Sequence, residues 1–340
     1  MRNSARLTTA LIVLTTFGSL AAEAAGHARP GKLCEGKSLL QEFAAADPLV
    51  YSRILRDAET IENGRAVLWK LERPGFQTSY LFGTVHLTDD RVTRLTDATR
   101  TALSEAKTLL IENASQQQEA TSGVYSAATK QAVFSDGRSL DKLLTKDEFA
   151  KVRRSIEGVG VPAAAAHIYK PWMITMLLAA SECERRRVQK GYLVLDMVVA
   201  EQARSLGMPV EGMETTEEQL LALASVPEDE QLGMLRANLA LVDKTDDLLE
   251  TMVQLYLERR ISALWDLQIA LARRAGVAPD AFASFERTLV VERNRKMRDV
   301  AISHMEKGPI FIATGALHLP GKTGLVALMR EAGFTVTAIE

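Results

Sequence analysis

Two histidines of this chain occur in the same local frame, and the repetition is the clearest chemical signal in the sequence. Each follows an apolar segment, a glycine and two further residues, in Gly83-Thr84-Val85-His86-Leu87 and Gly315-Ala316-Leu317-His318-Leu319. Glycine lets the backbone leave a strand at a sharp angle and lets a ligand approach it closely. Two imidazoles brought to one crevice can bind a divalent metal or divide the roles of acid and base.

A carboxylate is expected at the same edge of the predicted sheet. Glu112 directly follows Thr108–Ile111, a short apolar run whose pattern predicts a buried strand. Pockets of open α/β sheets lie outside the carboxyl ends of the strands. His86, Glu112 and His318 would leave an open position for a metal-bound water, as in metal-assisted hydrolysis. The alternative for each residue alone is a strand-end side chain that hydrogen-bonds to the backbone.

The elements that must position these residues lie near both ends of the chain. Further strand patterns are found at residues 67–70, 79–82, 309–314 and 335–339. The middle is helical in pattern, with capping boxes that begin at Thr145 and Thr215 and a long helix over residues 163–188 that bends or restarts at Pro171. We therefore expect one α/β domain over residues 25–340, with a mixed central sheet built from N- and C-terminal strands and a large helical insertion.

The first 24 residues have the pattern of a signal peptide. Arg2 and Arg6 precede an uncharged stretch over residues 7–22, and Ala22-Glu23-Ala24 fits the cleavage rule, so we expect cleavage before Ala25. A membrane anchor is the alternative, but the uncharged stretch is short for a spanning helix, which needs ~20 apolar residues. We therefore expect a periplasmic or secreted protein with no stable membrane span after cleavage.

Composition and missing motifs narrow the class of protein. The chain has 340 residues, 47% hydrophobic and 25% charged, with a formal net charge of −2. This is an ordinary globular composition, and the absence of a basic surplus argues against nucleic acid as a partner. The sequence contains no G-x-S-x-G elbow, no H-E-x-x-H helix and no phosphate-binding G-x-x-x-x-G-K-[ST] loop.

Cys34 and Cys183 are the only cysteines of the chain. An oxidising compartment permits a disulfide that ties the N-terminal segment to the helical middle, and the alternative is two free buried thiols. The export signal favours the disulfide.

The motifs belong to a wider pattern that resembles the TraB/GumN family, which includes the Tiki metalloproteases and is more distantly similar to erythromycin-esterase and ChaN-like proteins. The resemblance covers nearly the whole mature chain, and Met213 is a small departure because leucine is common there. The matching segments are Leu81–His86 with Asp89, Leu110–Glu112, Lys170–Trp172, Cys183-Glu184, Leu195-Asp196, Glu211–Gln219, Glu292–Asn294 and Gly315–Gly321.

The resemblance implies an EreA/ChaN-like α/β fold and, from Tiki-type members, metal-dependent peptidase activity. In this hypothesis His86, Glu112 and His318 hold a divalent metal (manganese, cobalt or zinc), and the bound water is the nucleophile. The resemblance also implies that Cys34 and Cys183 are paired.

Further polar residues are candidates for the same cleft. Arg293 or Lys170 would assist the charge that develops on a carbonyl oxygen. Lys170, Asp196, Glu214 and Asn294 are the candidate substrate-binding residues. The alternative for Arg293 is a buried ion pair with Asp196 or Glu214, and for Lys170 it is packing of a kinked helix.

Three functions are therefore compatible with the sequence. The favoured one is a metal-dependent hydrolase that acts on peptide bonds. The second is a metal-independent esterase-like hydrolase in which one histidine is the general base. The third is a non-catalytic envelope factor that binds a small molecule or partner in the same cleft. His167 and His304 lie in helical stretches without the repeated frame, and we interpret both as structural.

Overall fold

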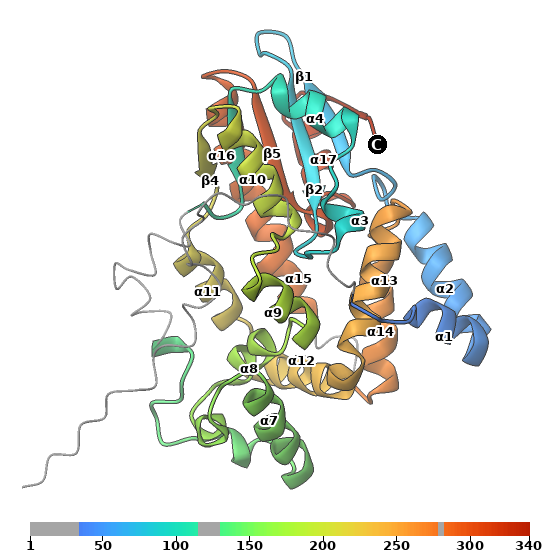
Figure 1. Ribbon diagram of the computed structural model, residues 1–340, viewed down its shortest axis with the longest axis vertical. Coiled ribbons are helices and arrows are strands. Elements are labelled where there is room, and N and C mark those ends of the chain that lie inside the picture. The colour runs from blue at the N-terminus through green and yellow to red at the C-terminus, as the bar shows by residue number, and fades with distance from the viewer. Residues whose placement is uncertain (1–33, 115–129, 278–281) are drawn as a thin grey trace, which may run out of the picture.

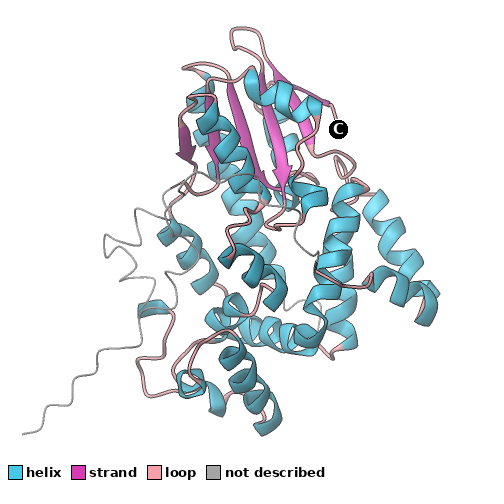
Figure 2. Cartoon of the chain, in the orientation of Figure 1, coloured by secondary structure: helices cyan, strands magenta, loops and turns pink. Residues whose placement is uncertain are grey.

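The computed structural model describes residues 34–114, 130–277 and 282–340. The predicted signal peptide, residues 1–24, lies outside this described part. One sheet occupies one end of the molecule and helices fill the rest (Figure 2). Within the described residues, no helix combines the length and apolar character needed to cross a membrane.

The sheet has six strands in the order β4-β3-β5-β2-β1-β6. Neighbours from β4 to β2 are parallel, whereas β1 is antiparallel to both β2 and β6. The mixed sheet confirms the predicted α/β fold, because β2 from the N-terminal part pairs directly with β5 from the C-terminal part. The strands are β1 Leu68–Glu72, β2 Ser79–Thr84, β3 Thr108–Ile111, β4 Val210–Gly212, β5 Ile310–Gly315 and β6 Thr335–Ala338.

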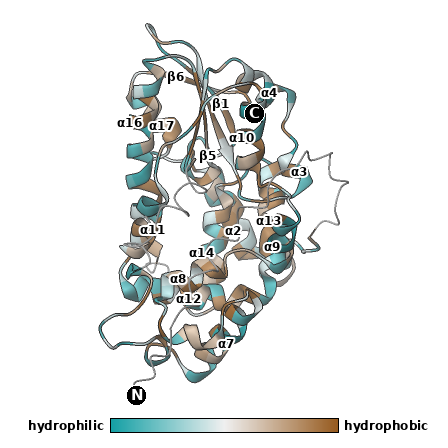
Figure 3. Cartoon of the chain, turned by 60° about the vertical axis from the view of Figure 1, so that its left-hand side comes forward, coloured by the Kyte–Doolittle hydropathy of each residue, from teal (hydrophilic) through white to brown (hydrophobic). Residues whose placement is uncertain are grey.

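Both faces of the sheet are buried by helices. On one face Phe82 and Phe311 belong to a core that includes α4 (Asp97–Ser104) and α10 (Leu195–Ser205). On the other face Leu81 and Ile312 pack with α16 (Arg293–Met305) and α17 (Leu325–Glu331). Burial on both faces explains why β2 and β5 are continuous apolar runs. The outer side of α16 is hydrophilic (Figure 3).

The remaining helices form a block beyond the carboxyl ends of the parallel strands (Figure 1). The predicted capping boxes at Thr145 and Thr215 are both present and begin α7 and α11. The α-helices of the block are α1 Leu39–Ala46, α2 Pro48–Glu59, α3 Asp90–Thr93, α7 Lys146–Gly158, α8 Pro171–Leu177, α9 Glu182–Gln189, α11 Thr216–Ala224, α12 Glu228–Leu241, α13 Thr245–Leu257, α14 Ala263–Arg274 and α15 Ala283–Glu286.

The predicted restart at Pro171 is confirmed, because α8 begins there, but the long helix expected over residues 163–188 is wrong: the segment forms three short pieces. A 3₁₀ turn, Ala163–His167, precedes α8, and α9 follows after a break. Pro171 occupies the first position of α8, where its missing N–H costs nothing. Ser181 then caps α9 by accepting the Glu184 backbone N–H at 3.1 Å.

A disulfide joins Cys34 to Cys183 at the start of α9, with the two Cα atoms 5.7 Å apart. This confirms the predicted pairing. The segment after Cys34 is bound to α13, because the Leu39 N–H donates to Thr251 Oγ1 at 2.8 Å and the Lys37 N–H donates to Asp247 Oδ1 at 2.7 Å. The disulfide therefore connects α9 to α13 through the N-terminal segment.

Candidate active site at the carboxyl edge of the sheet

The parallel strands end at one edge of the sheet, facing the helical block (Figure 2). His86 follows β2, Glu112 follows β3, Glu214 follows β4 and His318 follows β5. Strands β3 and β5 pair in a register that places Ile111 beside Ala313. This register brings two of the predicted metal ligands together, because His318 Nε2 lies 3.8 Å from Glu112 Oε1.

The Glu112 carboxylate lies at the centre of this edge and is largely buried, with 13% of its side chain exposed. Oε1 accepts hydrogen bonds from the Gly315 N–H at 2.7 Å and from Thr314 Oγ1 at 2.9 Å. Oε2 accepts a hydrogen bond from Arg293 Nη2 at 2.7 Å. Burial by itself would raise the pKa of Glu112, but a protonated His318, the Arg293 cation and the hydrogen bond from the Gly315 N–H outweigh burial and lower the pKa. Arg293 and the Gly315 N–H still favour the carboxylate where His318 is neutral. Glu112 is therefore an anion over the physiological pH range.

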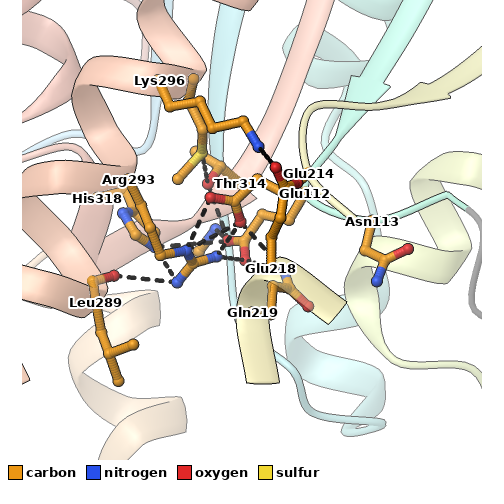
Figure 4. Close-up of polar contacts among 12 residues, drawn as sticks. Glu112, Asn113, Glu214, Glu218, Gln219, Leu289, Arg293, Lys296, Thr314 and His318 are labelled. Atoms are coloured by element: carbon orange, nitrogen blue, oxygen red, sulfur yellow. Dashed lines mark hydrogen bonds and ion pairs between the residues drawn. The ribbon is translucent and has the colours of Figure 1, made fainter. Parts of the chain in front are cut away.

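Arg293, the first residue of α16, bridges two carboxylates (Figure 4). Its Nη2 lies 2.7 Å from Glu112 Oε2 and 2.8 Å from Glu214 Oε2, and its Nε donates to Glu214 as well. A π-helical stretch, Arg287–Glu292, precedes α16, and the Leu289 carbonyl in it accepts from Arg293 Nη1 at 3.0 Å. The ion pair with Glu214 that the sequence left open is thus present.

His318 is held in one tautomer by its neighbours. Asn294 Nδ2 donates to the Thr323 carbonyl at 2.9 Å, which leaves Asn294 Oδ1 to accept from His318 Nδ1 at 2.6 Å. The lone pair of a neutral ring is then on Nε2, which lies 3.4 Å from Arg293 Nη1. Burial lowers the pKa of His318 to about 4, so the ring is neutral at physiological pH.

His86 has a different environment. Its Nδ1 lies 2.8 Å from Asp196 Oδ2, and Asp196 Oδ1 accepts a hydrogen bond from the Thr84 hydroxyl. The Asp196 charge raises the pKa of His86 to about 9, although 66% of the His86 side chain is exposed and water screens part of that attraction. The two rings are thus driven towards opposite protonation states.

The donor chemistry of the site fits a divalent metal. In each histidine Nδ1 is anchored by an oxygen, which is the usual support of metal-ligating histidines. His86 does not join Glu112 and His318 in a compact set, however. Among the described residues, only Cys34, Cys183 and Asp246 form a group of three His, Cys, Asp or Glu side chains in which one ligand atom from each lies within 4.8 Å of the others. Both sulfurs of that group are in the disulfide.

A protein-family model described as the TraB/PrgY/gumN family matches residues 67–338, from the residue before β1 to the end of β6. The chain belongs to the TraB/PrgY/gumN family. The matched range contains every residue of the carboxyl edge described above. A search of curated proteins finds no match.

The other predicted residues of this TraB/PrgY/gumN protein differ in how they relate to the edge. Asp196, Glu214 and Asn294 hold His86, Arg293 and His318 respectively, so their contacts are those of supporting residues. Lys170 precedes α8, and within the described part of the chain its one hydrogen-bonded contact with another segment is backbone pairing to Ala132. The substrate-binding role of these four residues stays a prediction.

The histidines interpreted as structural lie outside the edge. His167 contacts Asp141 at 2.9 Å and the ring of Phe149, whereas His304 contacts the Val300 carbonyl and Glu211.

Several residues of the edge were not predicted from the sequence. Thr314 donates to Glu112, and Gln219 on α11 lies 3.5 Å from Glu112 Oε2 and 3.4 Å from Glu214 Oε2. Thr84 supports Asp196. The available signals are that Thr84 and Thr314 sit at the ends of the strands that carry the repeated frame, and that Gln219 ends the segment Glu211–Gln219, which resembles the family.

Proposed function

We propose that this TraB/PrgY/gumN protein is a hydrolase that acts at the carboxyl edge of the sheet, with peptide bonds as the favoured substrate. The observation that carries the proposal is the pair of strand-end histidines. Asp196 and Asn294 each anchor a ring at Nδ1, and Glu112 lies 3.8 Å from Nε2 of His318. Pairs of this kind supply ligands or proton-transfer groups, because the fixed ring presents one nitrogen in a defined state.

In the favoured form of the proposal, His86, Glu112 and His318 hold a divalent metal (manganese, cobalt or zinc). When bound, such an ion lowers the pKa of water and polarises a substrate carbonyl. His318 contributes a neutral Nε2, since its Nδ1 bonds to Asn294. His86 must give up one proton before Nε2 can act as a ligand, and Asp196 keeps the other proton on Nδ1.

Arg293 is the group best placed to stabilise negative charge on a substrate oxygen. Its guanidinium is 16% exposed and lies between the Glu112 and Glu214 carboxylates, so it is fixed in position before a substrate arrives. A fixed cation stabilises developing charge more effectively than one that must reorganise. Lys170 is the weaker candidate for this role, because no contact in the described residues brings its side chain to Glu112.

A second candidate is a metal-independent esterase-like hydrolase. It is favoured because the His86 and His318 rings bond to chemically different groups. A carboxylate beside His86 supports the imidazolium, whereas the Asn294 amide beside buried His318 supports the neutral ring. Titratable pairs whose environments separate their protonation states mark acid and base roles. In this candidate His318 accepts a proton from water and His86 donates one to the leaving group.

The disulfide also supports a location outside the cytoplasm. Disulfides persist in oxidising compartments. We therefore propose that the mature protein is periplasmic or secreted.

Metal analysis and turnover together test these proposals. The protein is purified without chelator or metal-affinity resin, and metal content is measured for the wild type and for His86→Ala. Turnover is measured on a quenched-fluorescence peptide library and on p-nitrophenyl acetate, with added manganese, cobalt or zinc and with EDTA. The metal form predicts bound metal that His86→Ala loses and EDTA-sensitive turnover. EDTA-resistant ester turnover favours the second candidate, and absence of turnover under every condition contradicts both.

A further inference from the structure

A buried polar cluster outside the candidate active site holds the loop that follows β2. Thr88, two residues after His86, is 1% exposed. Glu184 Oε2 on α9 accepts both the Thr88 N–H at 3.0 Å and the Thr88 hydroxyl at 2.9 Å. Arg187 donates from Nε to the same hydroxyl oxygen at 2.7 Å and from Nη2 to the Thr88 carbonyl at 2.8 Å. Each polar group of Thr88 is therefore bonded to one helix.

The two charged residues that hold Thr88 are themselves buried. Glu184 is 7% exposed and Arg187 is 5% exposed. Arg187 also contacts Asp90 at 2.8 Å and lies over the ring of Tyr192 at 4.2 Å. Apolar residues of similar volume can often fill such a position at no loss of stability. The use of buried charges that bond to one threonine therefore points to a need for a defined loop conformation.

Residues 184–196, which include most of α9 and the start of α10, hold three consecutive residues of the loop. His86 is paired with Asp196, the Leu87 carbonyl accepts the Leu195 N–H at 3.2 Å, and Thr88 is bonded to α9. Because α9 and the start of α10 fix Thr88 and Leu87, they also set where the His86 ring meets the Asp196 carboxylate.

We infer that Glu184 and Arg187 are positioning residues for His86, acting through Thr88. The disulfide extends this support, because Cys183 directly precedes Glu184 and ties α9 to the segment bound to α13. The effect on the loop does not depend on the proposed function, whereas the effect on turnover rests on it.

Amide hydrogen exchange tests the effect on the loop. Thr88→Val replaces the hydroxyl with a methyl of similar size, and Arg187→Gln removes the cation. Either variant is expected to raise exchange over residues 85–90 by about tenfold or more, because local protection depends on these bonds. Exchange in β2 and β5 should stay at the wild-type rate.

Two matched variants control the exchange experiment. Thr88→Ser keeps the hydroxyl and should restore wild-type exchange. Arg236 on α12 bonds to Glu148 on α7 at 3.0 Å and to the Leu143 carbonyl at 3.2 Å, so Arg236→Gln removes a more exposed arginine with the same kinds of partner elsewhere. It should leave residues 85–90 unchanged. Wild-type exchange over 85–90 in Thr88→Val, or an equal rise across β2 and β5, would overturn the inference. Thr88→Val decides the question even if Arg187→Gln does not fold.

Turnover separates this inference from the proposed function. With whichever peptide or p-nitrophenyl ester the wild type hydrolyses, Thr88→Val should lower kcat by about tenfold or more at unchanged KM, because Thr88 supports His86 without binding substrate. If Thr88→Val raises exchange over residues 85–90 but keeps the wild-type kcat, the positioning role is refuted and the proposed function is unaffected. If Thr88→Val raises exchange over residues 85–90 and the wild type hydrolyses none of the substrates, the result supports the positioning of His86 and refutes the proposed function.

Discussion

His86 and His318 follow neighbouring parallel strands in the same G-x-x-H frame, yet the two halves of the site around them differ in burial, charge and support. In the His86 half, 66% of the imidazole side chain is exposed and a carboxylate holds Nδ1. In the His318 half, 8% of the side chain is exposed and an amide holds Nδ1, beside Arg293 and two carboxylates. The G-x-x-H frame places each histidine just after the end of a strand, whereas residues distant in sequence determine the protonation state of its ring.

The largest expected difference between the halves is in stability. Arg293→Ala leaves Glu112 and Glu214 buried without their shared cation, which should cost about 3–5 kcal/mol. The unfolding free energy from urea denaturation measures this. In the His86 half, Asp196→Asn should cost less than about 1 kcal/mol, because the exposed ring is screened by water. Equal losses in the two variants would contradict the contrast between a buried and an exposed half.

The disulfide sharpens the comparison because it lies on the side of His86. Replacing both Cys34 and Cys183 with serine should lower the unfolding free energy by about 2–4 kcal/mol, mainly by freeing the unfolded chain. Hydrogen exchange should then rise in α9 and the loop after β2 more than around β5. A loss of protection that is greater in β5 would show that the disulfide does not support the His86 half selectively.

The two halves should respond to pH with opposite signs. The folded pKa of His318, about 4, lies below the ordinary value, so the unfolded chain binds more protons between about pH 6.5 and pH 4. Stability is lost as pH falls through that window, by about 3 kcal/mol. The folded pKa of His86, about 9, lies above the ordinary value, so its smaller contribution is lost as pH rises from about 6.5 to 9.

Histidine-selective NMR titration checks these two signs directly. The rings should titrate on opposite sides of the ordinary histidine pKa, with His86→Gln and His318→Gln used to assign the signals. Titration of both rings at the same ordinary value would contradict the difference in environment.

The smallest expected effect on stability comes from the two capping boxes, which can be compared with each other. Thr215→Ala and Thr145→Ala should each cost about 1 kcal/mol of stability. Thr215 begins α11, which carries Gln219 next to Glu112, whereas Thr145 begins α7 in the helical block. Turnover should therefore fall only in Thr215→Ala, and an equal loss of turnover in both variants would count against a role for α11 in the site.

Short-range patterns were sufficient to predict much of the fold. The Thr108–Ile111 strand and the N- and C-terminal strands of one sheet follow from short apolar runs, and both capping boxes follow from the spacing of threonine and glutamate. β4 was missed because Val210–Gly212 is only three residues long and partly exposed, so it carries no buried apolar run. The restart at Pro171 was predictable from the proline, whereas the 3₁₀ turn at Ala163–His167 and the new helix start at the Ser181 cap were missed because the segment as a whole is apolar-rich.

The candidate residues of the site were predictable where a motif repeats, where a strand pattern ends or where a segment resembles the family. The frame identified the two histidines, and the end of the β3 run identified Glu112. Which carboxylate pairs with Arg293 depends on how α16 lies against β3 and β4, and a sequence pattern does not contain that distance. Thr88 and Arg187 gave no signal of their own, because single threonines and helical charges are common on protein surfaces. Glu184 is part of Cys183-Glu184, a segment that resembles the family, but this resemblance gave it no role.

The most direct test of the central claim is a double-mutant cycle on the two histidines, measured as kcat/KM on one substrate that the wild type hydrolyses. If His86 and His318 act in one reaction centre, His86→Ala and His318→Ala should each lower kcat/KM by about 100-fold or more, and the double variant should lose little beyond either single variant. Wild-type turnover in either single variant, or losses that multiply in the double variant, would contradict a shared centre at the carboxyl edge of the sheet.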